Sequence, residues 1–186
     1  PTTGDDRMAV SFWQKNTATG NSTSFWFDTI DSVRGMQAHL PWGNGNIFYD
    51  HRINNTATNY NRLTGAAPGD LVWTEWNHFL FIKEGTRKEL WINGVQGLTN
   101  TAPGFTTAIS ALYLGSYPSG ANSLQGVLDD FAIFNKAPSE EKIASLAAGV
   151  SPLELVGGAP DPLEITKIRQ EGDLVTLIWN SNELAT

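Results

Sequence analysis

The sequence predicts an all-β fold in which two antiparallel sheets pack as a sandwich, with one short helix near the C-terminal end of the domain. The main observation is a series of short runs in which apolar residues alternate with polar ones, each bounded by Gly, Asn, Pro or Ser. Few windows show helical periodicity. The predicted strands are residues 8–14, 24–28, 35–40, 46–50, 76–83, 88–92, 111–115 and 127–135. Seven or eight short strands of this kind suit two packed antiparallel sheets.

The clearest hairpin joins residues 76–83, "WNHFLFIK", to residues 88–92, "KELWI", through the turn "EGTR". Asn93-Gly94 then predicts a second tight turn, of the type in which the central residues take positive φ. His78 lies within the first of these strands, where a core or edge histidine is more common than a metal ligand.

One helix is predicted after the last strand. Ser139 is a suitable N-cap, and Glu140 and Glu141 suit the positive N-terminal end of a helix. Gly149 provides the stop. The apolar stripe that would face the domain consists of Ile143, Leu146 and Ala147.

The composition divides the chain into a large domain and a small appendage. Residues 1–149 form the sandwich, and residues 150–162 have the Pro and Gly content of a linker. Residues 163–186 predict a β-hairpin, which either packs on the first domain or begins a second β-sandwich module. Because the chain begins at Pro1 without Met or a signal peptide, we read it as a mature fragment of a larger protein.

Composition and charge exclude several functions. The net charge is -7, whereas a protein that binds nucleic acid needs a basic face. No stretch approaches 18 consecutive apolar residues, so we expect no membrane-spanning segment. The chain has no cysteine, which excludes disulfides, thiolate metal sites and a cysteine nucleophile.

Three segments in order resemble a known family. "MAVSFWQK", "WNHFLFIKEGTRKELWINGV" and "GVLDDFAIFNKAPSEEKIASL" are similar to the laminin-G-like, or concanavalin A-like lectin/glucanase, jelly-roll domain of secreted bacterial proteins. The resemblance covers roughly residues 7–149 and implies a two-sheet antiparallel jelly roll. Family members usually begin with one more strand, so that strand is absent here or supplied by another segment, including one in trans. The tail resembles the start of a fibronectin-type-III-like module.

Catalysis is not expected. Related glucanases and lyases use carboxylates clustered along one strand, and retaining hydrolysis needs two carboxyl groups about 5 Å apart. The sequence has no such run, and Asp129 and Asp130 are consecutive, so a regular strand would point them to opposite faces. No motif for an organic cofactor is present. A glycan hydrolase or lyase is the third hypothesis for the function of this chain.

A structural calcium ion is a candidate because the resemblance implies one. In the wider group such an ion is held by the aspartate of the closing strand and by groups near the N-terminus. Carried over, the ligands would be Asp129 with Asp5 or Asp6. The alternative is that Asp129 and Asp130 contact water or form salt bridges.

The candidate ligand-binding residues combine aromatic rings and polar groups near turns rich in Asn and Gly. Sugar recognition uses such a mixture, with a ring against the apolar face of the sugar and polar groups on its hydroxyls. The candidates are Trp42, Tyr49, His51, Arg52, Tyr60 and Trp91. Trp91 has the parity opposite to Leu90 and Ile92, so it should lie on the other face of its sheet. His39 and His51 flank a turn, and whether they approach one another stays open.

These features predict a non-catalytic extracellular module that binds carbohydrate or a surface protein. The protein would be secreted or displayed at a cell surface. The alternative is an architectural module of a surface layer, filament or large adhesin, with self-assembly in place of a ligand.

Overall fold

The computed structural model describes residues 7–29, 34–51, 61–101, 109–155, 165–171 and 174–179. The chain divides into two compact units, Pro1–Val150 and Ser151–Thr186. Each unit is described by itself. No helix among the described residues is long and apolar enough to cross a membrane.

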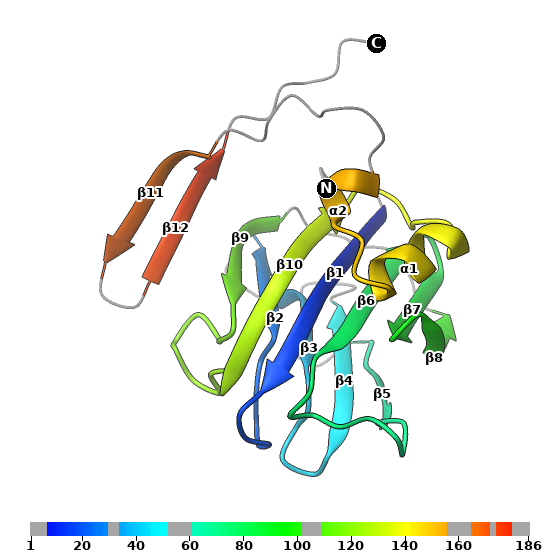
Figure 1. Cartoon of the computed structure of the whole chain (residues 1–186). Coiled ribbons are helices and arrows are strands. Elements are labelled where there is room, and N and C mark those ends of the chain that lie inside the picture. Colours follow the sequence, from blue (N-terminus) through cyan, green and yellow to red (C-terminus); the bar gives the residue numbers. More distant parts are fainter. Residues whose placement is uncertain are drawn as a thin grey trace, which may run out of the picture. The chain divides into compact units, whose positions relative to one another are not determined.

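The larger unit contains two five-stranded antiparallel sheets (Figure 1). In the first sheet the strand order is β10-β1-β6-β7-β8. Its strands are β10 (Gly126–Phe134), β1 (Arg7–Asn16), β6 (Asn77–Glu84), β7 (Arg87–Ile92) and β8 (Val95–Thr101). The predicted turn Asn93-Gly94 joins β7 to β8, and both residues have positive φ, 49° and 80°. That prediction is confirmed.

In the second sheet the strand order is β5-β4-β3-β2-β9. Its strands are β5 (Leu63–Ala66), β4 (Asn46–His51), β3 (Arg34–His39), β2 (Phe25–Thr29) and β9 (Ile109–Leu114). The predicted all-β sandwich is therefore confirmed, with β5 and β8 as strands that the sequence did not predict.

The core between the sheets is rich in aromatic rings. Phe12 on β1 lies at its centre, with its ring stacked on Phe81 at 5.9 Å and on Phe131 at 5.7 Å. Phe25 of the second sheet meets Phe12 edge-on, so the two sheets are joined through side chains that alternate inward along each strand.

Helix α1 (Glu140–Ala147) covers part of the outer face of the first sheet (Figure 1). Its N-cap is Ser139, whose hydroxyl accepts a hydrogen bond from the Lys142 N–H, and Gly149 follows with φ 87°. Both ends agree with the prediction. Ile143 is buried and packs with Leu80 and Ile82 of β6 in a second apolar cluster. A short helix, α2 (Pro152–Leu155), begins the smaller unit.

The smaller unit also contains an antiparallel pair, β11 (Ile165–Glu171) and β12 (Leu174–Trp179). This pair lies within the predicted hairpin. Its likeness to a fibronectin-type-III-like module stays a prediction.

Candidate functional site

A cleft with a tryptophan on each of two separate segments opens at one end of the sandwich. Its volume is about 190 Å³. We call it the tryptophan cleft, and its lining residues are Thr19, Gly20, Pro41, Trp42, Gly43, Gly45 and Trp73. The cleft thus has two large rings and otherwise small, uncharged residues.

The loop between β3 and β4 places Trp42. The Trp42 N–H donates to the Asn46 carbonyl at 2.8 Å, and the Gly45 N–H donates to the Trp42 carbonyl at 2.8 Å. Gly45 has φ 81°, a conformation that favours glycine. A Cβ atom at Gly43 would lie 2.6 Å from Oδ1 of Asn21, which accepts the Gly43 N–H. These bonds hold the main chain on both sides of the indole.

The core and β1 place Trp73. Its ring is nearly parallel to that of Phe79, with centroids 6.1 Å apart and an angle of 13° between the planes. Its carbonyl accepts the N–H of Asn16, the last residue of β1, at 2.9 Å. Trp73 is therefore anchored to the first sheet, whereas Trp42 follows a strand of the second.

A row of aromatic rings continues from Trp42 over the outer face of the second sheet. The His39 ring lies 4.5 Å from that of Trp42 and 5.7 Å from that of Tyr117. Tyr117 in turn meets Trp26 edge-on at 4.8 Å. His39 also contacts the Ser22 carbonyl through Nδ1 at 2.9 Å. The row is thus packed against polar groups that hold His39 in place.

An ion pair with a buried carboxylate lies on the same face. The Arg62 guanidinium donates to both oxygens of the Asp50 carboxylate at 2.8 Å, and Gln37 Nε2 donates to Asp50 as well. Arg62 also lies 4.7 Å over the Phe48 ring. Asp50 is fully buried and Arg62 is 43% exposed, so this pair presents a guanidinium that is already neutralised.

The structure retains some predicted ligand residues and corrects others. Trp42 lines the tryptophan cleft. Tyr49 does not reach the surface: it is 0% exposed and its hydroxyl donates to the Ile82 carbonyl at 3.1 Å. His51 is also 0% exposed and lies opposite Met36 on the inner side of β4. Both predictions are wrong, because alternation along β4 points these side chains inward with Ile47.

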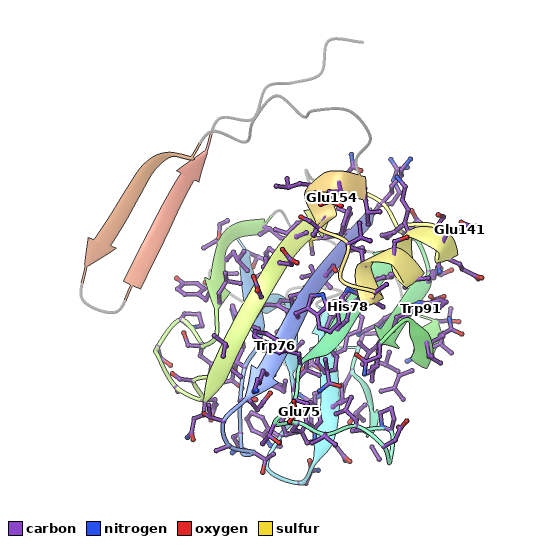
Figure 2. All side chains as sticks on the ribbon, viewed as in Figure 1. Glu75, Trp76, His78, Trp91, Glu141 and Glu154 are labelled. Carbon is purple, nitrogen blue, oxygen red and sulfur yellow. The ribbon has the colours of Figure 1, made fainter. Side chains whose placement is uncertain are left out.

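The remaining predictions concern Arg52, Tyr60, Trp91 and a contact between His39 and His51. Arg52 and Tyr60 lie outside the described residues. Trp91 lies on the outer face of the first sheet, as its parity predicted, where it packs against the cluster beneath α1 and donates its indole N–H to Glu89 at 2.8 Å (Figure 2). His39 and His51 do not meet, because their partners across the β3–β4 pair are Phe48 and Met36 respectively.

The sequence profile of the concanavalin A-like lectin/glucanases superfamily matches residues 1–144. The chain belongs to this superfamily. This confirms the resemblance to a concanavalin A-like lectin/glucanase domain and the fold that it implied, while secretion and a bacterial source stay predictions. No curated protein matches the chain in sequence.

Solved structures similar to this concanavalin A-like domain come from several kinds of protein. One is a heptameric SAP-like pentraxin from Limulus polyphemus, with TM-score 0.59 and 14% identity over 76% of this chain and 70% of that chain. Another is domain 4 of an extracellular arabinanase from Geobacillus stearothermophilus, in complex with arabinotriose, with TM-score 0.59 and 20% identity over 76% and 66%. A third is the binding domain of botulinum neurotoxin DC in complex with SialylT, with TM-score 0.59 and 12% identity over 79% of this chain and 36% of that chain. At these identities the similarity shows the fold.

In this concanavalin A-like domain the closing strand β10 contains a bulge at its acidic pair. Ser11 pairs with Ala132 and Trp13 with Asp129, so β10 has one residue more than β1 between these rungs. Asp130 takes φ 48°, and its N–H donates to Asp129 Oδ1 at 2.8 Å. Both carboxylates are exposed, while Leu128 and Phe131 pack on the core. The prediction that a regular strand separates the two acids is wrong because the bulge interrupts the alternation.

The described residues do not by themselves form a calcium site. No group of three or more His, Cys, Asp or Glu side chains gathers in the described part of the chain. Calcium takes six to eight oxygens, and β10 supplies two carboxylates. The other predicted ligands, Asp5 and Asp6, lie outside the described residues, so calcium stays a prediction.

The calcium prediction can be tested by melting two matched variants with calcium and with chelator. If calcium binds at Asp129, saturating calcium should raise the Tm of the wild type by about 5 °C, and Asp129→Asn should lose that rise. Asp130→Asn is the control, since asparagine tolerates the positive φ of this position. Equal melting of the wild type in calcium and in chelator would exclude the site.

Proposed function

We propose that this domain is a non-catalytic carbohydrate-binding module in which the tryptophan cleft receives the ligand. The observation that carries the proposal is that Trp42 and Trp73 line one cleft from separate segments of the chain. Aromatic rings stack on the apolar face of a sugar and add dispersion and burial to its hydrogen bonds.

The size and charge of the cleft indicate the class of sugar. Its volume of about 190 Å³ is below the roughly 300–1,000 Å³ of pockets that enclose drug-sized ligands, so we expect it to hold one sugar ring of a longer glycan. None of its described lining residues carries a charge. Burying a carboxylate in such a site would be unfavourable. The proposed ligand is therefore a neutral glycan.

The same cleft supports two further proposals, on catalysis and on the location of the parent protein. The described lining residues include no carboxylate or histidine, the groups on which general acid–base chemistry depends. We therefore propose binding without hydrolysis. With this function, the parent protein would be secreted or displayed at the cell surface, where extracellular glycans are available.

A glycan array with three tryptophan variants tests the proposal. The wild type should retain neutral glycans in preference to sialylated or uronic-acid glycans. Trp42→Ala and Trp73→Ala should each weaken binding about tenfold or more, since each removes one stacking surface. Trp76→Ala is the matched control, because Trp76, labelled in Figure 2, is 42% exposed. It is not among the residues that line the cleft.

Two results would count against the proposal. If the domain binds no glycan on the array, the alternative of an architectural module is favoured, and self-association of the domain should then be measured. If a glycan is retained but Trp42→Ala and Trp73→Ala bind it as well as Trp76→Ala does, the ligand binds elsewhere. Thermal melting of each variant shows whether a loss of binding reflects unfolding.

A further inference from the structure

The two walls of the tryptophan cleft are joined through a single residue of β1. The Asn16 main-chain N–H donates to the Trp73 carbonyl at 2.9 Å. Its side-chain Nδ2 donates to the Leu40 carbonyl at 3.0 Å, two residues before Trp42. Asn16 is 1% exposed, so both bonds are shielded from water.

The side chain of Asn16 is itself held in one orientation. Its Oδ1 accepts a hydrogen bond from Gln14 Nε2 at 2.8 Å, and the same nitrogen donates to the Leu40 carbonyl at 2.8 Å. Ser22 Oγ donates to that carbonyl at 2.9 Å. Three buried side chains thus converge on one carbonyl group. An amide that uses both its donor and its acceptor in a buried network has little freedom to rotate.

These contacts differ in what they connect. Gln14 and Ser22 both hold the Leu40 carbonyl, and Ser22 also donates to the Pro41 carbonyl at 3.1 Å. Neither has a hydrogen bond to Trp73 among those of the described residues. Asn16 contacts both walls directly. Of the three residues whose side chains hold the Leu40 carbonyl, Asn16 is the one that is also bonded to Trp73.

We propose that Asn16 is a positioning residue for ligand binding, which sets the separation of Trp42 and Trp73. This inference rests on the proposed function of the cleft. A sugar ring between two indoles needs both at contact distance, and a gap of 0.5–1 Å already forfeits roughly a quarter to a half of the dispersion attraction. Loss of the side-chain bond to the Leu40 carbonyl would remove the direct link between the loop of Trp42 and the wall of Trp73, while Gln14 and Ser22 still hold that carbonyl.

Fluorine NMR of protein labelled with 5-fluorotryptophan tests the link without any ligand. Trp42→Phe and Trp73→Phe assign the two resonances. Asn16→Ala should shift or broaden both of them. Ser22→Ala is the matched control, because it removes hydrogen bonds to the same loop but should perturb the Trp42 resonance alone. If Asn16→Ala leaves both resonances as in the wild type, the proposal is overturned.

Binding of a glycan that the wild type retains gives the second readout. Asn16→Ala should weaken its affinity about tenfold, whereas Ser22→Ala should change it by less than about threefold. If Asn16→Ala does not fold, Asn16→Leu replaces it, since leucine keeps roughly the size of the side chain and lacks the amide donor without burying a charge. Equal affinities of the Asn16 variant and the wild type would overturn the positioning role.

The two proposals fail in different ways. If the wild type binds no glycan, the proposed function fails, while the fluorine spectra still decide whether Asn16 couples the two walls. If the wild type binds through Trp42 and Trp73 but the Asn16 variant changes neither spectra nor affinity, only the positioning role is lost.

Discussion

Lowering the pH from 7 to 4 is expected to destabilise the domain by about 3 kcal/mol through His78 alone. His78 lies on the outer face of β6 and is buried, with Nε2 2.9 Å from the Ser11 hydroxyl and its ring 5.5 Å from that of Trp13. Burial lowers the pKa of His78 from 6.5 to about 4. The folded state therefore holds a neutral imidazole, whereas the unfolded chain takes up a proton below pH 6.5.

The direction of this effect follows from the two pKa values. Between pH 6.5 and 4 the unfolded state binds more protons than the folded state. The contribution of His78 to the free energy of unfolding is therefore fully present above pH 6.5 and is lost as the pH falls toward 4. Denaturant unfolding of the wild type and of His78→Gln at pH 7 and pH 4 measures it. The glutamine variant should lose about 3 kcal/mol less over this range than the wild type. The prediction is wrong if the two proteins lose the same stability from pH 7 to 4, or if NMR shows that the His78 imidazole of the folded protein titrates near pH 6.5.

Raising the pH from 7 to 9 is expected to stabilise the domain by about 2 kcal/mol through Lys88. Lys88 is fully buried, its Nζ donates to the Asn61 carbonyl, and it lies 4.3 Å over the Tyr49 ring. Burial lowers the pKa of Lys88 from 10.5 to about 7, with Lys83 and Arg62 acting in the same direction and Asp50 opposing it. The desolvation of the ammonium thus outweighs its contacts.

For Lys88, as for His78, the free energy of unfolding rises with pH, but the rise falls in a different pH range. Between pH 7 and 10.5 the unfolded chain holds the proton that the folded state gives up, so stability rises with pH. Lys88→Met keeps the length of the side chain and removes the charge, and it should abolish this rise. Lys142→Met, on the exposed surface of α1, should behave like the wild type. If the stability of Lys88→Met still rises from pH 7 to 9, the rise is due to another titratable group and the prediction is wrong.

The sequence was most informative where strands have one buried face. Alternation along β1 and β7, and the Asn93-Gly94 turn, predicted both the strands and their inward-facing side chains. β8 was missed because it is an exposed edge strand, "VQGLTNT", with no apolar alternation. β5 was missed because it has four residues, one of them glycine. Pairing with a neighbouring strand, rather than local pattern, defines such segments.

The acidic pair of β10 shows where strand alternation fails. Leu128 and Phe131 both pack on the core although they are three residues apart, which a regular strand does not allow. Two consecutive polar residues between apolar ones are a signal of a bulge. Strand alternation alone therefore does not place Asp129 and Asp130.

The candidate site was predicted in part. Trp42 was identified from its glycine-rich turn, whereas Trp73 was missed because it lies between predicted strands and nothing in the local pattern brings it to Trp42. The link is made by Asn16, beyond the predicted end of the first strand, through hydrogen bonds to segments distant in sequence. Tyr49 was misassigned although it shares the inward parity of Ile47. Alternation could have excluded it, but only contacts between distant segments reveal the cleft.

A crystal structure of the domain with a glycan that it retains is the most direct test of the central claim. We expect one neutral sugar ring between Trp42 and Trp73, in contact with both indoles. A glycan bound elsewhere, along the outer face of the second sheet or beside Trp91, with the tryptophan cleft unoccupied, would contradict it.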